Sequence, residues 1–211
     1  MTRVLIASRN NGKIAEFKEL LQGLAVDVLS LDDFKGLPDV AETGVTFQEN
    51  ALLKARAAAS TGLVALADDS GLEVDCLGGA PGIYSSRFAG LEQDDAANIR
   101  KLLAAMDGVP DSRRTARFRC VIAIAAPDGS EYLSEGVCEG RITAAIRGVD
   151  GFGYDPVFLV PSLDQTFAEL GALVKNRISH RAQAMTNARK ILVSLLRHEP
   201  EGSEHVGRSP E

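Results

Sequence analysis

Strand patterns and helix patterns alternate through the first half of this chain. The strand patterns cover residues 3–8, 26–30, 64–68 and 72–75. Helical apolar stripes cover residues 11–22, 47–61 and 94–106. Strands that alternate with helices need a sheet with helices packed on its faces, so this order is typical of an α/β fold with a mixed sheet.

A hairpin and a final helix are expected in the second half. Residues 115–126 and 132–147 have strand patterns, and Asp128-Gly129 between them is a turn signal. A helix is predicted over residues 179–197. We expect the hairpin to form a second lobe, which gives a mixed central sheet flanked by helices and two lobes with a cleft between them. One domain would cover residues 1–198, and the polar residues 199–211 are typical of a disordered tail.

The composition argues against several classes of protein. The 211 residues are 45% hydrophobic and 25% charged, which suits one soluble domain or two lobes around a cleft. No apolar run approaches the roughly 20 residues that a membrane span needs. The net charge of -6 argues against a general nucleic-acid binder. Three widely separated cysteines match neither a disulfide framework nor a metal pattern, so we expect a reducing, cytoplasmic setting.

Two adjacent carboxylates, Asp68 and Asp69, follow the apolar run 64–67 and precede Ser70 and Gly71. We expect the strand to end here, with the acids at the edge of a cleft and Gly71 allowing the chain to turn. Neighbouring strand residues point to opposite faces, so the two acids should have different roles. One can bind a hard cation or orient a water molecule, and the other can anchor the backbone. The alternative is that the pair only terminates the strand, since Asp, Ser and Gly are ordinary turn residues.

Residues 8–13, Ser-Arg-Asn-Asn-Gly-Lys, join the first strand to the first helix. A helix N-terminus offers unpaired N–H groups and a partial positive charge, which favour a phosphate. Lys13 in the first turn opposes the helix dipole, and a bound anion would resolve this conflict. The glycine spacing of a P-loop is absent. The alternative is an Asn N-cap followed by a solvated lysine.

Two glutamates lie at the start of the second helix. Glu49 follows Thr46 by the spacing of a capping box, so it already has a structural role. Glu42 lies outside the helix and has no such explanation. We therefore prefer Glu42 as a metal ligand, and the alternative is an exposed loop acid.

Two later segments have features of a ligand site. Residues 151–156, Gly-Phe-Gly-Tyr-Asp-Pro, can bring the backbone close to a ligand while Phe152 covers a flat ring; the alternative is a bent strand with a core aromatic. Residues 175–181 place several cations at the opening of the last helix, with Ser179 as its N-cap. In an acidic protein this segment favours an anionic ligand. The alternatives are a solvated basic face and, for His180, a buried structural histidine.

In this order the motifs resemble those of the inosine triphosphate pyrophosphatase family, which hydrolyses non-canonical purine nucleoside triphosphates. The segments that carry the resemblance are residues 8–13 with Glu16, 42–54, 67–87, 151–158 and 175–181. The resemblance implies a mixed α/β fold with a nucleotide cleft between two lobes, a homodimer and a requirement for Mg²⁺. It also implies hydrolysis of ITP, dITP and XTP to the nucleoside monophosphate and pyrophosphate, which removes them from the nucleotide pool.

The same resemblance implies roles for individual residues. Asp69 would be the catalytic acid-base residue and a ligand of Mg²⁺, and Glu42 would be the second metal carboxylate. The residues that would bind the substrate are Ser8, Arg9, Asn10, Asn11, Gly12, Lys13, Ser70, Phe152, Gly153, Tyr154, Asp155, Lys175, His180 and Arg181.

Two alternatives to this function stay open. A nucleotide-binding regulatory protein without turnover would keep the cations and Phe152 but would not need the carboxylates of Asp69 and Glu42. A metal-dependent phosphatase would release orthophosphate stepwise instead of pyrophosphate.

Overall fold

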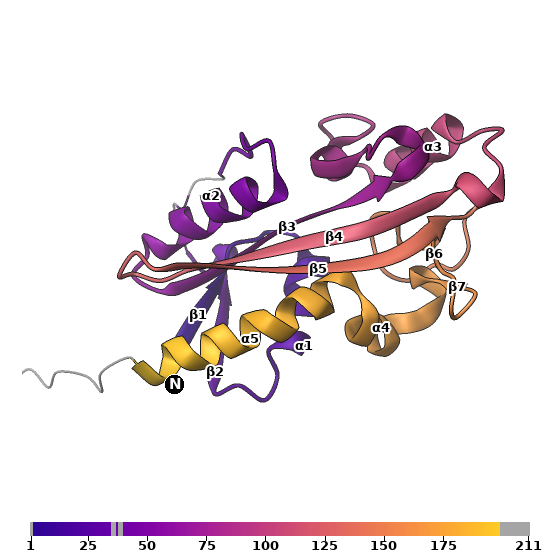
Figure 1. Ribbon diagram of the computed structural model, residues 1–211. Helices are drawn as coiled ribbons and strands as arrows, with labels where there is room; N and C mark the ends of the chain where they lie inside the picture. The colour runs from indigo at the N-terminus through magenta and orange to yellow at the C-terminus, as the bar shows by residue number, and fades with distance from the viewer. Residues whose placement is uncertain (1, 35–36, 38–39, 199–211) are drawn as a thin grey trace, which may run out of the picture.

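The computed structural model describes residues 2–34, 37 and 40–198. Its centre is a seven-stranded sheet with the strand order β2-β1-β3-β4-β5-β6-β7 (Figure 1). The strands are β1 (Thr2–Ile6), β2 (Val26–Ser30), β3 (Val64–Val74), β4 (Thr115–Ala125), β5 (Glu131–Ile142), β6 (Phe158–Val160) and β7 (Gln165–Thr166). β1 is parallel to β2 and β3, and the other neighbouring pairs are antiparallel. The predicted mixed sheet is therefore confirmed.

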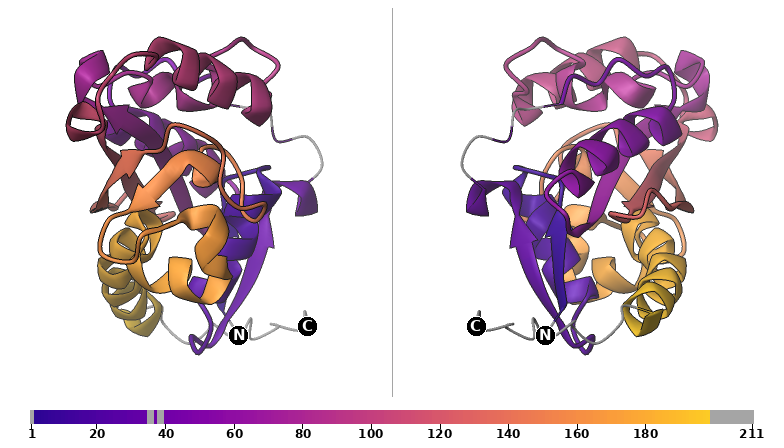
Figure 2. Two further views of the ribbon diagram at one scale, coloured as in Figure 1. Left: turned by 90° about the vertical axis from the view of Figure 1, so that its right-hand side faces the viewer. Right: turned by 90° about the vertical axis from the view of Figure 1, so that its left-hand side faces the viewer.

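Helices cover both faces of this sheet (Figures 1 and 2). They are α1 (Asn11–Leu20), α2 (Phe47–Ala59), α3 (Asp95–Ala105), α4 (Phe167–Ile178) and α5 (His180–His198). In the part of the chain that the structure describes, the connections contain the short 3-10 helices η1 (Leu31–Asp33), η2 (Asp75–Leu77), η3 (Gly82–Arg87), η4 (Asp111–Arg113) and η5 (Asp155–Val157). The predicted helices 11–22, 47–61, 94–106 and 179–197 are thus confirmed to within a few residues at each end.

Three groups of buried apolar side chains hold these layers together. The first core joins α1 and α5 to one face of β1, β3 and β4, and it includes Phe17 and Leu192. The α2 core lies on the opposite face and includes Phe47. The distal core surrounds the far ends of the long strands and includes Phe158 and Phe167. Burial of large side chains of this kind contributes about 1.5–3 kcal/mol each.

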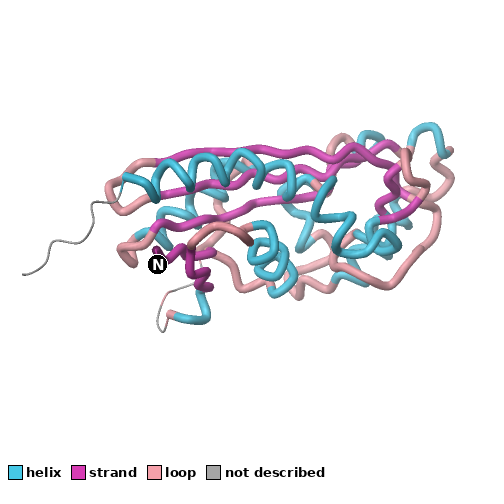
Figure 3. Tube along the Cα trace, turned by 90° about the horizontal axis from the view of Figure 1, so that it is seen from below, coloured by secondary structure: helices cyan, strands magenta, loops and turns pink. Residues whose placement is uncertain are grey.

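The two lobes are the two ends of one sheet. The first core and the α2 core occupy one end of the long strands, and the distal core occupies the other. β4 pairs with β3 from Ala65↔Ala125 to Val74↔Ala116, and the strands run side by side along the molecule (Figure 3). The expectation that the hairpin forms a lobe of its own is therefore wrong. Its first strand, β4, is paired with β3 along nearly the whole length of β3.

β3 is one continuous strand, so the prediction that the chain turns at the acidic pair is wrong. Asp68 and Asp69 pair with Ile122 and Val121 of β4 in the middle of the strand, and this non-local pairing decides the conformation. Gly71 is needed for a close approach instead of a turn. A Cβ atom there would lie 2.3 Å from the Gly82 carbonyl oxygen of η3.

Residues 158–178 contain elements that the sequence patterns did not indicate, namely β6, β7 and α4. α4 is interrupted at Gly171, whose φ of 69° is not helical, and a glycine inside an apolar pattern weakens the signal for a helix. Lys175 lies in the last turn of α4. Our placement of Lys175 at the opening of the last helix is therefore wrong, and a cation in this last turn suits the helix dipole.

Two further expectations concern the ends of the chain and the membrane. The predicted tail, residues 199–211, lies outside the described residues. Among the helices that the structure describes, none is long and apolar enough to cross a membrane.

We predict that Gly71→Ala destabilises the fold by about 1–3 kcal/mol, because the new methyl group forces η3 away from β3. Urea denaturation would measure the free energy of unfolding. Gly90→Ala is the matched control, since its Cβ would meet the flexible end of the Glu92 side chain instead of backbone. Equal stability of the two variants would contradict the close-approach explanation.

Candidate active site

The acidic pair of β3 serves both faces of the sheet, as the strand period predicted. On one face Asp68 contacts Lys13 of α1 and Arg181 of α5. On the other face Asp69 contacts Asn50 and Lys54 of α2. The two acids have different surroundings and can therefore perform different tasks.

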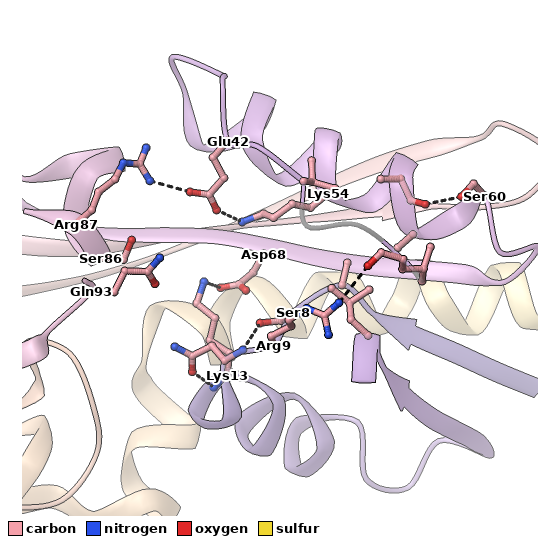
Figure 4. Close-up of a pocket in the computed structure, with 17 residues that line it drawn as sticks. Ser8, Arg9, Lys13, Glu42, Lys54, Ser60, Asp68, Ser86, Arg87 and Gln93 are labelled. Atoms are coloured by element: carbon pink, nitrogen blue, oxygen red, sulfur yellow. Dashed lines mark hydrogen bonds and ion pairs between the residues drawn. The ribbon is translucent and has the colours of Figure 1, made fainter. Parts of the chain in front are cut away.

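Asp68 is a buried carboxylate that joins three distant parts of the chain. Its Oδ2 lies 3.1 Å from Lys13 Nζ (Figure 4). The same oxygen lies 3.0 Å from an Arg181 terminal nitrogen and accepts a hydrogen bond from Ser70 Oγ at 3.0 Å. Burial disfavours the charge, but Lys13 and Arg181 outweigh this cost and hold the pKa of Asp68 far below its ordinary value. Asp68 is therefore an ionised anchor at neutral pH.

The two cations in first helical turns are both neutralised by Asp68. Asn10 is the N-cap of α1, and its side chain accepts a hydrogen bond from Lys13 N at 3.0 Å. Arg181 stands in the first turn of α5, where Ser179 Oγ accepts from Ala182 N. The unfavourable position of these cations at helix N-termini is compensated by a carboxylate of the protein itself and not by a bound anion alone.

A row of alternating charges continues from Arg181 toward residues 151–155. Arg181 pairs with Glu16 of α1, and the other Glu16 oxygen lies 2.8 Å from Lys175 Nζ. Lys175 Nζ lies 2.6 Å from Asp155 Oδ2, which also accepts a hydrogen bond from Phe152 N at 2.9 Å. Burial raises the pKa of Asp155 despite the adjacent lysine. The row ties the loop that carries Phe152 to α1 and α4.

A second charged group lies on the α2 side of β3. Lys54 Nζ lies 2.8 Å from Glu42 Oε1, and Arg87 of η3 contacts the other Glu42 oxygen at 3.0 Å (Figure 4). Lys54 Nζ also lies 3.5 Å from Asp69 Oδ1. Burial raises the pKa of Asp69 despite Lys54. For Glu42, burial is outweighed by Lys54 and Arg87, so its pKa is lowered. Glu49 instead accepts from Val45 N, which confirms a structural role at the helix start.

Aromatic side chains form the distal part of the site. The Phe152 ring lies against the start of α1, where a Cβ on Gly12 would meet it at 2.7 Å. Lys175 Nζ lies 4.5 Å from the centre of the same ring. His180 is buried and stacks on Phe118 with ring centroids 4.7 Å apart. Burial, with help from Arg181, lowers the pKa of His180 well below its usual value, so the imidazole is neutral.

These residues line a cleft with two connected parts. The aromatic pocket, of about 120 Å³, includes Asp69, Phe152, Lys175 and His180. The larger groove, of about 710 Å³, includes Asp68, Lys54 and Arg87 (Figure 4). Both parts are lined by Asn10, Lys13, Glu42 and Ser86. The shared residues therefore stand where the aromatic pocket opens into the groove.

The structure brings most of the predicted site residues into this cleft. Gly12, Asn11 and Arg9 have other surroundings than the rest. The predicted residues that line it are Ser8, Arg9, Asn10, Lys13, Glu42, Asp69, Ser70, Phe152, Gly153, Tyr154, Asp155, Lys175, His180 and Arg181. Gly12 contributes by its missing side chain, and Asn11 is exposed at the start of α1. Arg9 forms an exposed ion pair with Asp32 at 2.6 Å.

Several residues of the site were not selected from the sequence. Lys54, Asn50 and Arg87 surround the Asp69 and Glu42 carboxylates, and Asp95 accepts a hydrogen bond from Gly153 N at 2.7 Å. Lys54 and Asn50 differ by four residues, so they lie on one face of α2. This four-residue spacing is the feature of the sequence that could have indicated that Asn50 and Lys54 belong to the site.

The donor set of this cleft fits a hard divalent cation. The carboxylates of Glu42 and Asp69 both contact one ammonium group, Lys54, which shows that they face a common position. Among the described residues no cluster of three His, Cys, Asp or Glu side chains could hold a metal. Mg²⁺ suits such a site, because it needs only one or two carboxylates and keeps several waters or phosphate oxygens.

Comparison with known proteins places the chain in a family. A model described as "Ham1 family" matches residues 4–191. The chain belongs to the Ham1 family. A protein named dITP/XTP pyrophosphatase from Desulforamulus reducens is 54% identical over 198 residues, which are 93% of this chain and 98% of that protein. One of the same name from Bacillus subtilis is 47% identical over 91% of this chain and 98% of its own length.

Solved structures of Ham1 proteins share this fold. The Coxiella burnetii protein superposes with a TM-score of 0.83 at 47% identity, covering 92% of this chain and 100% of that one. The Staphylococcus aureus protein gives a TM-score of 0.82 at 42% identity with the same coverage. The open mixed sheet of this Ham1 chain is therefore the fold of its solved relatives.

We predict that Asp68→Asn destabilises this Ham1 protein by about 3–5 kcal/mol, because Lys13 and Arg181 lose their shared countercharge. Urea denaturation at neutral pH would measure the free energy of unfolding. Glu139→Gln, which removes an exposed carboxylate beside Arg117, is the control and should change stability little. A loss no larger than that of the control would show that Asp68 is not the anchor.

Proposed function

We propose that this Ham1-family protein hydrolyses the non-canonical purine nucleoside triphosphates ITP, dITP and XTP to the nucleoside monophosphate and pyrophosphate. The observation that carries the proposal is the shared part of the cleft, where the Glu42 carboxylate and the Lys13 ammonium line one space beside Asp69. The relatives at about half identity that are named dITP/XTP pyrophosphatases support the same substrates. This activity would remove abnormal purine nucleotides from the nucleotide pool.

The phosphates would lie at the start of α1. Ser8, Asn10 and Lys13 line the groove there, and the helix N-terminus adds a partial positive charge. Lys54 and Arg87 supply further cations next to Glu42. These groups would stabilise the negative charge that develops on the phosphate oxygens.

Asp69 would accept the proton of the water that attacks the α-phosphorus, while pyrophosphate leaves. Its raised pKa suits this role, because a stronger base takes a proton more readily. Asn50 Nδ2 donates to Asp69 Oδ2 at 3.2 Å and holds the carboxylate in place. Glu42 and Asp69 would hold Mg²⁺, which when bound neutralises phosphate charge and acidifies its water.

The base would enter the aromatic pocket against Phe152. The Lys175 ammonium has three N–H groups, and Glu16 and Asp155 accept two of them. A purine with an oxygen at position 6 offers an acceptor to such a donor. Adenine presents an amino group there, and two donors facing each other in a buried site cost about 1–3 kcal/mol.

Two accompanying proposals concern the setting of the protein. We expect a homodimer, as the family resemblance implies. We also expect the protein to act in the reducing cytoplasm, and its cysteines at 76, 120 and 138 are all free thiols.

We predict that ITP, dITP and XTP are cleaved with kcat/KM at least about tenfold above that for ATP.

We predict that Asp69→Asn lowers the rate of hydrolysis about 10²–10⁴-fold. Its melting temperature should be kept or raised, because burial already disfavours the charge of Asp69. Product analysis and thermal denaturation would measure both, with Glu139→Gln as control.

The product identifies the reaction class. Pyrophosphate supports the proposal. Orthophosphate released stepwise would indicate a phosphatase, and tight binding of ITP without products would indicate a regulatory protein. Full activity of Asp69→Asn would refute the role of Asp69.

Metal dependence gives a separate prediction. Chelation should abolish turnover, and Glu42→Gln should raise the Mg²⁺ concentration needed for half-maximal rate, because one carboxylate ligand is lost. Glu49→Gln is the matched control, since Glu49 caps Val45 N. A shift in Glu49→Gln but not in Glu42→Gln would reverse our choice between the two glutamates.

A further inference from the structure

The larger groove continues well past the residues that it shares with the aromatic pocket. We call this continuation the outer section, and it is lined by Arg9, Leu31, Leu37, Val40, Ala57 and Ser60. None of these six residues lines the aromatic pocket. The whole groove has a volume of about 710 Å³, within the roughly 300–1,000 Å³ of pockets that bury whole small molecules.

α2 shows how far the outer section extends. Lys54, Ala57 and Ser60 follow one another at three-residue spacing along one side of the helix. The rise along the helix axis from Lys54 to the C-cap Ser60 is about 9 Å, so the lining of the groove extends about that far along α2. In Figure 4 Ser60 and Arg87 lie at opposite ends of the drawn residues, with Glu42 and Lys54 between them.

The lining of the outer section is mostly apolar. Leu31, Leu37, Val40 and Ala57 contribute only aliphatic side chains to this lining. Its cation, Arg9, is already paired with Asp32 at 2.6 Å and donates to the Leu37 carbonyl at 3.2 Å. Apolar walls beside a planar guanidinium favour a flat, largely apolar group such as a nucleoside.

We propose that the outer section accepts a second nucleoside attached to the terminal phosphate, so that dinucleoside polyphosphates with a 6-oxopurine are also substrates. This rests on the proposed function, since one base must occupy the aromatic pocket and the phosphates must lie at Lys13. The second nucleoside then extends along α2 toward Ser60.

The reaction is the same hydrolysis with a larger leaving group. With two inosines joined 5′ to 5′ by three phosphates, water attacks the α-phosphorus of the inosine in the aromatic pocket. The bond from that phosphorus to the bridging oxygen breaks, and the water proton passes to Asp69. The products are IMP, which keeps the water oxygen, and IDP, which leaves with the bridging oxygen.

Diinosine triphosphate and ITP, assayed side by side in isotopically labelled water, test the proposal. We expect both to be cleaved, with the label in IMP and none in IDP. Ala57→Leu fills the outer section and should lower kcat/KM for diinosine triphosphate about tenfold or more while ITP cleavage is unchanged. Ser60→Phe, at an exposed position, should act in the same direction.

The control and the outcomes separate this proposal from the proposed function. Ala96→Leu, at an exposed position of α3 outside the groove, should affect neither substrate. If ITP is cleaved and diinosine triphosphate is not, the second-nucleoside site is refuted and the pyrophosphatase function stands. If ITP is not cleaved, the proposed function itself fails. Label in IDP, or equal losses for both substrates in Ala57→Leu and Ser60→Phe, would also overturn the outer site.

Discussion

The contact between Asp68 and the two cations Lys13 and Arg181 is the interaction on which the site depends. It joins β3 to the first turns of α1 and α5, which come from opposite ends of the chain. On this face of β3, Leu66 belongs to the first core and Leu72 to the distal core, so Asp68 lies in the polar interval between them. At this point a buried charge network, instead of apolar packing, connects the two lobes beside the cleft.

The compensated charges also explain the limits of sequence reasoning. The strand period indicated that Asp68 and Asp69 would face opposite sides, and the structure agrees. The structure brings the cations Lys13, Lys175 and Arg181 to one pocket, but the carboxylates that pair with them could not be assigned from the sequence. Glu16, for example, meets Lys175 and Arg181 only because α1 packs beside the junction of α4 and α5. Such pairings are long-range in sequence and follow from packing.

The fold was predictable where structure is decided locally and not where it is decided by distant partners. The N-cap at Asn10 and the Asp128-Gly129 turn follow from local chemistry and are found where expected. The continuity of β3 depends on pairing with β4, so the local turn signal at Gly71 was misleading. α4 was not predicted, because Gly171 interrupts it with a non-helical conformation. Only at β3 among these elements did a tertiary constraint override a local preference.

Gly12 contributes to the site by what it lacks. Because no side chain projects there, the Phe152 ring rests directly on the first turn of α1, and the wall that would hold the base abuts the helix end that would hold the phosphates. A purine that displaced this ring would also press on that helix end. The base and the phosphates would thus contact two structural parts that move together. A base that fits poorly would then misplace the phosphorus to be attacked, even if that base were bound tightly.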